Sequence, residues 1–219
     1  MQPGSGWHGS PGRVDGAMPR IRAENIAAHK ELTRVEILDA AYELIGDAGT
    51  ADISLAEVAL RVGIGRTTLY EYVRHKDDLI ATLVEDRLPG VVDGMLEQVD
   101  AADSIPDRLR MLAELTVEFV VADPVLGVIL HRELPRLSGE AQERIRASHH
   151  ELAARMMSLY REGVGQGIFR RMPPDLAGRL MNDTMMAAAK VLISAPNPTE
   201  RLDEVTAVTG EYLLAGLRT

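Results

Sequence analysis

The chain has 219 residues, an excess of nine negative charges and no cysteine. Without cysteine, disulfides, thiolate catalysis and cysteine-ligated zinc or iron–sulfur sites are excluded. Hydrophobic residues make up 46% of the sequence, which is enough for a sizeable core. No apolar run approaches the roughly 20 residues that span a bilayer, because Glu118, Asp123 and Lys190 interrupt the most hydrophobic stretches. These features predict a soluble protein with a cytoplasmic location.

The first 19 residues are rich in Gly, Pro and Ser and contain no apolar segment of the kind found in secretion signals. We interpret residues 1–19 as a flexible leader or a remnant of an expression vector. Structure is expected to begin near Ile21. Apolar residues then recur at steps of three and four as far as Ala48, and Gly49 can end a helix, so a first helix is predicted over 31–48.

Two short helices are predicted between residues 54 and 73. Ser54 and Glu57 form a capping-box pattern, and Gly63 stops the helix that follows after barely two turns. A third segment, from Gly65 to about Val73, comes after a break long enough only for a tight turn. Ala59 permits close approach of the two helices, and Gly63 accepts the left-handed conformation of the turn. This spacing is typical of a helix-turn-helix.

The remainder of the chain predicts longer helices. One runs from Asp77 to about Val99 and contains Pro89, which lacks an amide donor and should bend the helix. With no alternating strand pattern and only eight aromatic residues, the sequence predicts an all-α protein of about nine helices. Further helices are expected over 105–122, 124–135, 139–165, 174–194 and 199–217. The breaks between them are marked by Pro, Gly and Asn.

No enzyme motif, metal site or cofactor site is recognised in the sequence. The glycines of the pattern Gly163-x-Gly165-x-Gly167 end a helix and do not follow a strand, so we interpret them as a helix stop and not as a nucleotide-binding loop. We therefore predict that the protein is not an enzyme and carries no cofactor.

The run GIGRTTLYEYVRHKDDL, residues 63–79, with ISLAEVA upstream at 53–59, resembles the DNA-binding domain of TetR-family transcriptional repressors. In that family a Leu-Tyr-x-His/Tyr-Phe pattern ends the third helix, and a Lys and an acidic residue open the fourth. The sequence departs from the pattern at Val73, where Phe is usual, and at Gly65, where Ser or Thr is common. The resemblance covers residues 31 to about 84, and the matching residues are Leu69, Tyr70, Tyr72, Lys76 and Asp77.

The resemblance implies an N-terminal three-helix helix-turn-helix DNA-binding domain, which we place at 20–76. A larger C-terminal helical domain for ligand binding and dimerisation follows at 77–219. Within residues 61–76, four basic side chains stand against one acidic side chain, so DNA affinity is expected to be local in this acidic chain.

We assign DNA contacts from geometry and resemblance together. Base contacts are expected from Arg66, Thr67 and Thr68, since Arg suits the two acceptors of guanine and Thr suits a thymine methyl. Phosphate contacts are expected from Tyr70, Tyr72 and Lys76. Four basic residues near the start of the first helix could reach the adjacent backbone or minor groove, but solvated charges are equally consistent with Arg20, Arg22, Lys30 and Arg34.

Methionines in the larger domain could line an adaptable pocket, although ordinary core or dimer packing explains them equally well. His149 stands in an apolar series and is either a polar contact for a ligand or a satisfied core histidine. The candidate pocket residues are Met111, Phe119, His131, His149, Met156, Asn182 and Met185.

The last two predicted helices have apolar arcs too wide for one small neighbour. Two copies could close a four-helix bundle across a twofold axis, as the resemblance also implies. The residues expected at this homodimer interface are Leu180, Thr184, Ala187, Val191, Val205, Thr209, Tyr212 and Leu213.

Together these features predict a ligand-responsive DNA-binding transcriptional regulator. We expect a repressor that binds a pseudo-palindromic operator in double-stranded DNA as a dimer and is released by a small apolar or amphipathic effector, with no membrane partner. The alternative is a helical small-molecule-binding protein or adaptor without DNA-binding activity.

Overall fold

The computed structural model describes residues 18–218, with side chains from residue 25 onward. Contacts divide the chain into two units, one up to Glu36 and the other from Ile37 to the C-terminus. Residues 1–17 of the predicted leader lie outside the described residues, whereas residues 18 and 19 already belong to a helix.

Within the described residues the chain forms ten α-helices, one π-helical turn and one 3-10 turn. No strand occurs between residues 18 and 218, only an isolated bridge between Phe169 and Arg218, so the all-α prediction is confirmed. The elements are α1 Met18–Ala48, α2 Leu55–Val62, α3 Arg66–Leu69, α4 Lys76–Asp100, α5 Ile105–Ala122, α6 Pro124–Val128, the π turn η1 Ile129–Glu133, the 3-10 turn η2 Leu134–Arg136, α7 Gly139–Ser148, α8 His150–Gly165, α9 Pro174–Ile193 and α10 Pro198–Leu217.

In the first unit, α1 begins at Met18, well before the predicted start at residue 31. More than half of the residues between are Ala, Glu, Arg, Lys and Met, which favour helix by intrinsic propensity without forming an apolar face. The hydroxyl of Thr33 donates to the carbonyl of His29 at 3.1 Å, and Arg34 pairs with Glu31 at 2.7 Å one turn away. Apolar spacing alone therefore could not locate this helix start.

Two predicted helices are each divided in the structure. The predicted helix 139–165 is α7 and α8, separated at His149, whose φ of −119° and ψ of 16° interrupt the helix. The apolar spacing continues across this break because Ile145 of α7 and Met156 of α8 both enter the core. The predicted helix 124–135 is α6 followed by the π-helical turn η1, which is wider than an α-helix, and the 3-10 turn η2, which is tighter. An apolar spacing that continues across a break in the helix does not show where the break lies.

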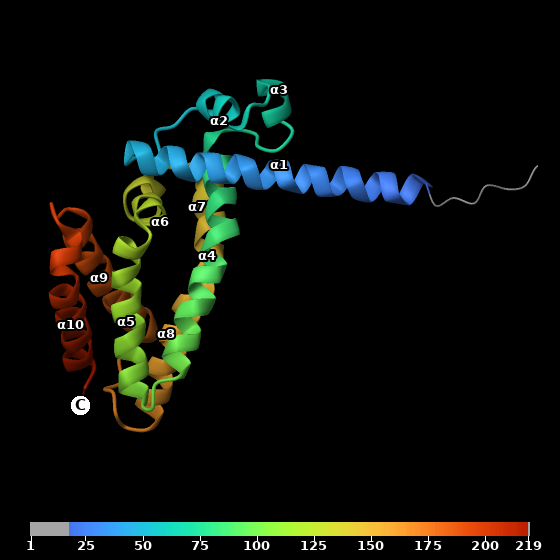
Figure 1. Ribbon diagram of the computed structural model, residues 1–219. Coiled ribbons are helices and arrows are strands. Elements are labelled where there is room, and N and C mark those ends of the chain that lie inside the picture. The colour runs from blue at the N-terminus through green and yellow to red at the C-terminus, as the bar shows by residue number, and fades with distance from the viewer. Residues whose placement is uncertain (1–17, 219) are drawn as a thin grey trace, which may run out of the picture. The chain divides into compact units, whose positions relative to one another are not determined.

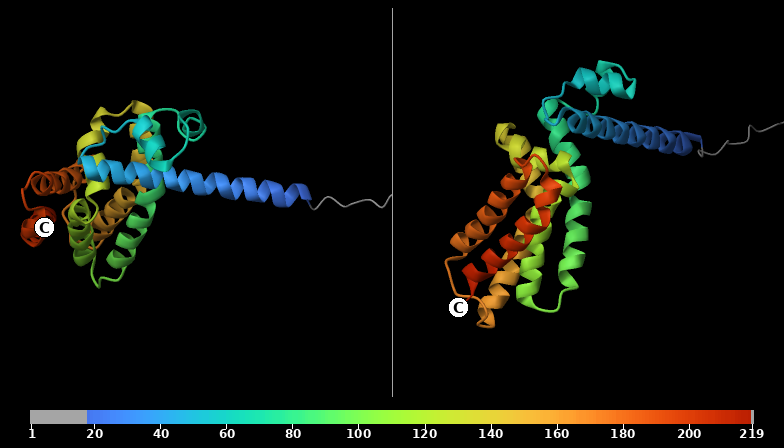
Figure 2. Two further views of the ribbon diagram at one scale, coloured as in Figure 1. Left: turned by 45° about the horizontal axis from the view of Figure 1, so that its top comes forward. Right: turned by 60° about the vertical axis from the view of Figure 1, so that its left-hand side comes forward.

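In the second unit, α4, α5 and α8 pack lengthwise against one another, and α9 and α10 cover α5 (Figures 1 and 2). Their buried faces share one core, to which α4 contributes Leu79, Leu83 and Val84. None of the helices between residues 18 and 218 combines the length and apolar content that a membrane crossing requires.

The glycine pattern after α8 is a helix stop, as predicted. Helix α8 ends at Gly165, and Gly167 has a φ of 73°, which favours glycine. A side chain at Gly163 would come within 2.1 Å of the Phe169 ring, which packs over it and stacks on Tyr160. These close contacts fold the segment after α8 back onto the helix.

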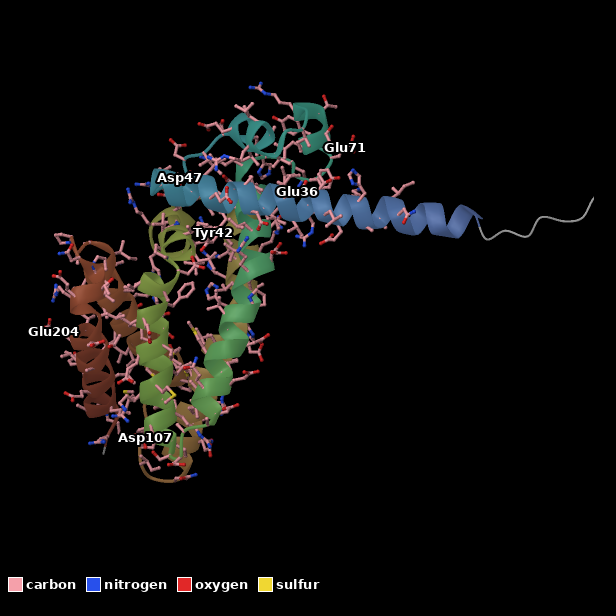
Figure 3. All side chains as sticks on the ribbon, viewed as in Figure 1. Glu36, Tyr42, Asp47, Glu71, Asp107 and Glu204 are labelled. Carbon is pink, nitrogen blue, oxygen red and sulfur yellow. The ribbon has the colours of Figure 1, made fainter. Side chains whose placement is uncertain are left out.

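The C-terminal part of α1 is joined to the start of α6 by a half-buried hydrogen bond. Tyr42, labelled in Figure 3, donates its hydroxyl to the carboxylate of Asp123 at 2.9 Å. The same carboxylate caps α6 by accepting from the amide of Leu126. Arg87 of α4 lies over the Tyr42 ring, 4.4 Å from its centroid, and pairs with Asp39. This cluster holds α1, α4 and α6 together.

Candidate nucleic-acid interface and internal cavity

Helices α2 and α3 form the predicted helix-turn-helix. Ser54 and Glu57 close a complete capping box at the start of α2, and Gly63 ends the helix with a φ of 80°. The amide of Ile64 returns to the carbonyl of Ala59 at 3.0 Å, which tightens the turn. Ala59 and Leu69 are buried between the two helices, as the close approach requires.

The third helix is shorter than predicted. Regular α-helix covers only Arg66–Leu69, but hydrogen-bonded turns continue to Val73, whose amide donates to the carbonyl of Leu69 at 3.1 Å. Gly65 precedes the helix and offers no side-chain cap, in contrast to Ser54 before α2. The recognition segment is therefore one turn of α-helix with a turn-like extension.

The predicted base-contacting residues lie together on the outer face of this segment. Arg66, Thr67 and Thr68 are all exposed, whereas Leu69 on the inner face has no exposed surface. The glutamate that follows them, Glu71, is also exposed and is labelled beside α3 in Figure 3. The three side chains are therefore free to meet the edges of base pairs.

The predicted phosphate contacts are presented differently from one another. Tyr70 is 57% exposed, and Tyr72 is half-buried. Lys76 opens α4 and forms an exposed ion pair with Asp52, 3.1 Å between Nζ and Oδ1. A phosphate would therefore compete with the Asp52 carboxylate for Lys76.

Arg74 and His75 join this surface, although the sequence analysis did not single them out. A depression of about 320 Å³ beside α3 has no acidic residue in its lining. Phosphate oxygens are bound by such groupings of Arg, Lys, His and Tyr. The lining consists of Leu55, Ala56, Arg66, Leu69, Tyr70, Arg74, His75 and Lys76.

The basic residues near the start of α1 are only partly described. The side chains of Arg20 and Arg22 lie outside the described residues, Lys30 is exposed, and Arg34 pairs with Glu31. Their contact with DNA stays a prediction.

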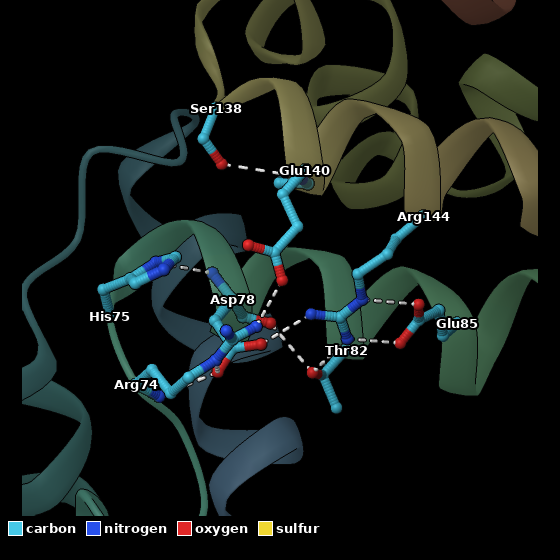
Figure 4. Close-up of polar contacts among 9 residues, drawn as sticks. Arg74, His75, Asp78, Thr82, Glu85, Ser138, Glu140 and Arg144 are labelled. Carbon is cyan, nitrogen blue, oxygen red and sulfur yellow. Dashed lines mark hydrogen bonds and ion pairs between the residues drawn. The ribbon is translucent and has the colours of Figure 1, made fainter.

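Arg144 of α7 ties that helix to the first three turns of α4 (Figure 4). Its guanidinium donates to Asp78 at 2.5 Å, to Glu85 at 2.7 Å and to the hydroxyl of Thr82 at 2.9 Å. Three acceptors on one helix face use most of the donors of one arginine. The contact joins α7 to the end of α4 that follows the helix-turn-helix.

Asp78 is the buried centre of this network. Burial acts to raise its pKa, but the backbone amide of Arg74 and the guanidinium of Arg144 outweigh burial and hold the pKa below its ordinary value. The amide of Arg74 donates to Asp78 at 2.7 Å, and the Arg74 side chain reaches Glu140 of α7 at 2.6 Å. The segment just after the recognition helix is thus bonded to both α4 and α7.

An apolar cavity of about 350 Å³ lies among helices α4, α5, α7, α8 and α9 and the turns η1 and η2. Of the candidate pocket residues, Met111 does not line it and instead packs, half-buried, against the core from α5. The other six do line it: Phe119, His131, His149, Met156, Asn182 and Met185. Leu88, Val92 and Met95 of α4 also line the cavity. They could not be predicted from the sequence, because their apolar spacing is that of any core-facing helix.

Two histidines stand in the cavity wall. Burial, followed by the charges of His149 and Lys190, lowers the pKa of His131 to about 4. Burial is also the largest cause that lowers the pKa of His149. Nδ1 of His149 is buried and makes no hydrogen bond of normal geometry, although the backbone of Ile145 lies near enough to act to raise the pKa of His149. Of the two readings of His149, a polar group facing the cavity agrees with this position better than a satisfied core histidine.

The face expected to carry the dimer interface is only partly exposed. Val205, Thr209 and Leu213 of α10 are buried within the chain, where α10 packs on α5, so they are not available to a second copy. Their assignment was wrong because spacing alone does not show which face of α10 meets its own chain. Apolar or small side chains that remain accessible on α9 and α10 are Leu176, Leu180, Thr184, Ala187, Val191, Val208 and Tyr212.

Two family descriptions match most of the described chain. Residues 37–83 match "Bacterial regulatory proteins, tetR family", and residues 102–190 match "Tetracyclin repressor-like, C-terminal domain". The first covers the helix-turn-helix and the start of α4, and the second covers much of the cavity wall. The chain belongs to the tetR family of transcriptional regulators.

Individual relatives are distant. The chain is 22% identical over 111 residues to the Fatty acid metabolism regulator protein of Bacillus subtilis, which covers 51% of this chain and 57% of that protein. It is 24% identical to the HTH-type transcriptional repressor KstR2 of Mycolicibacterium smegmatis, over 72% of this chain and 78% of that one. The first match thus spans little more than half of that relative.

A solved structure shows the same fold. The transcriptional regulator FadR from Bacillus subtilis, in complex with stearoyl-CoA, superposes with a TM-score of 0.70 at 19% identity. The superposition covers 83% of this chain and 98% of FadR. The superposed part of this chain therefore has the same fold as FadR.

Proposed function

We propose that this chain is a repressor that binds a pseudo-palindromic operator as a homodimer and leaves it when an apolar or amphipathic molecule enters the cavity. The main support is that Arg66, Thr67 and Thr68 are exposed on a helix-turn-helix whose inner residues Ala59 and Leu69 are buried. We propose that it acts as a regulator and not as an enzyme, in the cytoplasm with the chromosome. Its membership of the tetR family supports this proposal.

Roles divide between reading and positioning. Arg66, Thr67 and Thr68 contact base edges in the major groove, because an exposed Arg and two Thr can meet guanine acceptors and thymine methyls. Tyr70, Tyr72 and Lys76 contact phosphates and set the register. The depression with no acidic lining beside α3 supports the second assignment.

Dimerisation uses the accessible face of α9 and α10. Leu180, Ala187, Val191 and Tyr212 are exposed in the single chain, and Thr184 is half-buried on the same helix as the first three. Exposed large apolar residues gathered on two adjacent helices are typical of an interface. A symmetric dimer places two recognition helices about 34–36 Å apart, or a multiple of that spacing.

Release requires a ligand that prefers a conformation unfit for DNA. Helix α7 is suited to transmit this conformational change from the cavity to α4. Arg146 and His149 line the cavity, and Arg144 of the same helix holds the start of α4. Displacement of α7 by a ligand would loosen the Asp78 contact, and with it the seating of the helix-turn-helix. The relative crystallised with stearoyl-CoA supports an effector with an apolar body. Coupling of this kind is typically about 1–3 kcal/mol.

The test is selection of genomic fragments by the purified full-length chain, followed by gel shift with the selected duplexes. We expect one or a few pseudo-palindromic sites bound with steep salt dependence. An Arg66→Ala, Thr68→Ala double variant that still folds should lose selection. A dimer that ignores every duplex at low salt would favour the alternative, a helical binding protein or adaptor without DNA-binding activity.

A further inference from the structure

The lining of the cavity is chemically one-sided. Its polar groups are His131, His149, Arg146, Asn182 and Thr116, and no Asp or Glu is among the lining residues. The hydroxyl of Thr116 already donates to the carbonyl of Leu112 at 2.7 Å. A cationic ligand would find neither a carboxylate nor an aromatic cage, since Phe119 is the only aromatic residue of the lining.

The apolar part of the wall fits a flexible aliphatic body. Four of its side chains are methionines, Met95, Met156, Met185 and Met186, which adapt to irregular shapes. The volume of about 350 Å³ corresponds to roughly a dozen non-hydrogen atoms at the ~30 Å³ that each water occupies in the liquid. A chain of about ten carbons with a small polar head matches this size.

The polar groups come from three separate elements. His131 lies on η1, His149 lies at the junction of α7 and α8, and Asn182 lies on α9. The charge of His149 acts to lower the pKa of His131, and the buried Nδ1 of His149 has no hydrogen bond of normal geometry within the chain. A ligand that brings an acceptor, and above all a negative charge, would relieve both conditions.

We propose that the cavity binds an aliphatic monocarboxylate of about ten carbons, with its carboxylate held by His131 and His149. This rests on the proposed function only in treating the cavity as the effector site. It specifies the effector as a free carboxylate. A neutral alcohol, a cation or a bulky conjugate of the same chain would not bind in this way.

Binding of a carboxylate should change the protonation of His131 and His149. Both histidines are mostly neutral at neutral pH because burial lowers their pKa values. A carboxylate against them favours the protonated imidazole, so ligand binding takes up a proton. The other charged groups near the pair are Arg146 of α7 and Lys190 of α9, both cationic. Glu133, the buried acid of η1, pairs with Arg132 and Arg136 and does not line the cavity.

The experiment is calorimetric titration of the purified full-length chain with sodium decanoate, in two buffers of different ionisation enthalpy. Matched probes are decanol, decyltrimethylammonium and decanoyl-coenzyme A. We expect decanoate to bind at least tenfold more tightly than the other three, with net proton uptake and an affinity that rises several-fold from pH 7.5 to pH 6.5. Equal binding of decanol, or binding without proton uptake, would overturn the proposal. So would exclusive binding of the coenzyme A thioester.

Variants locate the carboxylate. His131→Gln and His149→Gln should each weaken decanoate binding about tenfold and reduce proton uptake, and should weaken decanol binding much less. His150→Gln removes an exposed histidine that does not line the cavity and should bind like the wild type. If both cavity variants fold and retain wild-type decanoate binding and proton uptake, the assignment is wrong. If either variant fails to fold, the wild-type comparison of decanoate with decanol still decides the ligand class.

Gel shift on the unliganded protein separates this proposal from the proposed function. A chain that binds decanoate as described but no duplex refutes the repressor and leaves the ligand class standing. A chain that binds a selected duplex but not decanoate refutes the ligand class alone.

Discussion

The guanidinium of Arg144 and the carboxylate of Asp78 lie 2.5 Å apart, although they come from α7 and α4 and are 66 residues apart in sequence. Asp78 is buried, and its remaining oxygen accepts from the amide of Arg74 at 2.7 Å. The same Arg144 reaches Glu85 about two turns further along α4 (Figure 4). This contact fixes the end of α4 that follows the recognition helix against the helix that leads to the cavity.

Replacing Arg144 by Met should destabilise the fold, because it leaves Asp78 buried with less compensation. We expect a loss of about 1–3 kcal/mol in the free energy of unfolding, since removing one partner of a buried pair is much more harmful than losing an exposed pair. Urea unfolding followed by circular dichroism measures it. Arg201→Gln breaks an exposed pair with Glu204 and should stay within about 0.5 kcal/mol of the wild type. A loss no larger than the control's would show that the contact is not structural.

Arg66→Ala and Lys76→Ala should weaken DNA binding in different ways. The loss of Arg66 should cost about 1–3 kcal/mol and relax the preference at one base pair, whereas loss of Lys76 should weaken all sequences and lower the salt slope by about one. Fluorescence anisotropy with matched and mutated operators distinguishes the two patterns. Arg171→Ala, an exposed arginine between α8 and α9, is the control. A reversed pattern would exchange the two roles.

Asp52→Asn should strengthen DNA binding. The Asp52 carboxylate pairs with Lys76 at 3.1 Å in the free chain and would repel a phosphate placed there. Because Asp52 is largely exposed and Lys76 is partly exposed, we expect only a gain of a few fold, largest at low salt. The same anisotropy assay at two salt concentrations checks it, and weaker binding would mean that Asp52 positions Lys76 for DNA.

Leu180→Glu and Tyr212→Glu should dissociate the proposed dimer, because each puts a charge on an apolar surface that the second copy would cover. Leu180 is 48% and Tyr212 is 69% exposed in the single chain. Sedimentation velocity should show a monomer at concentrations where the wild type is a dimer. Leu60→Glu changes a leucine that is 82% exposed on α2 and should leave the dimer intact. A dimer that persists in both α9 and α10 variants would place the interface elsewhere.

Stability should fall as pH decreases from 6.5 toward 4. The folded protein holds His131 with a pKa of about 4, whereas the unfolded chain protonates it near 6.5, so acid favours the unfolded state in this window. Relative to its value above pH 6.5, the free energy of unfolding should fall by about 2 kcal/mol by pH 5. Urea unfolding at pH 7.5 and pH 5 measures the loss. His131→Gln should reduce the loss, and His150→Gln should not; equal losses would contradict the assignment.

The parts of the fold that the sequence predicted are those governed by local chemistry. Ser54, Glu57 and Gly63 determine the caps and turn of α2 through their nearest neighbours, so the helix-turn-helix could be located from the sequence. The cavity was partly located because His131, His149 and Asn182 are polar groups inserted in apolar helices. Local spacing was sufficient for the helix-turn-helix but only in part for the cavity.

The parts that it missed depend on contacts between distant segments. Val205, Thr209 and Leu213 share an apolar spacing that predicts a buried face, but only the position of α5 decides that their own chain covers it. The contact of Arg144 with Asp78 has no sequence signature, because many exposed arginines of this chain pair with neighbours one turn away. The division at His149 stayed hidden because both α7 and α8 continue the same apolar series.

The most direct test of the account is the binding of the wild type and of Arg66→Ala to a genomic duplex that the wild type selects, at about 100 mM salt. The account predicts saturable binding of the wild-type dimer, competed poorly by unrelated DNA, and a loss of at least tenfold at the selected site for the variant. Equal binding of both proteins to selected and unrelated duplexes would contradict the claim that this surface reads DNA.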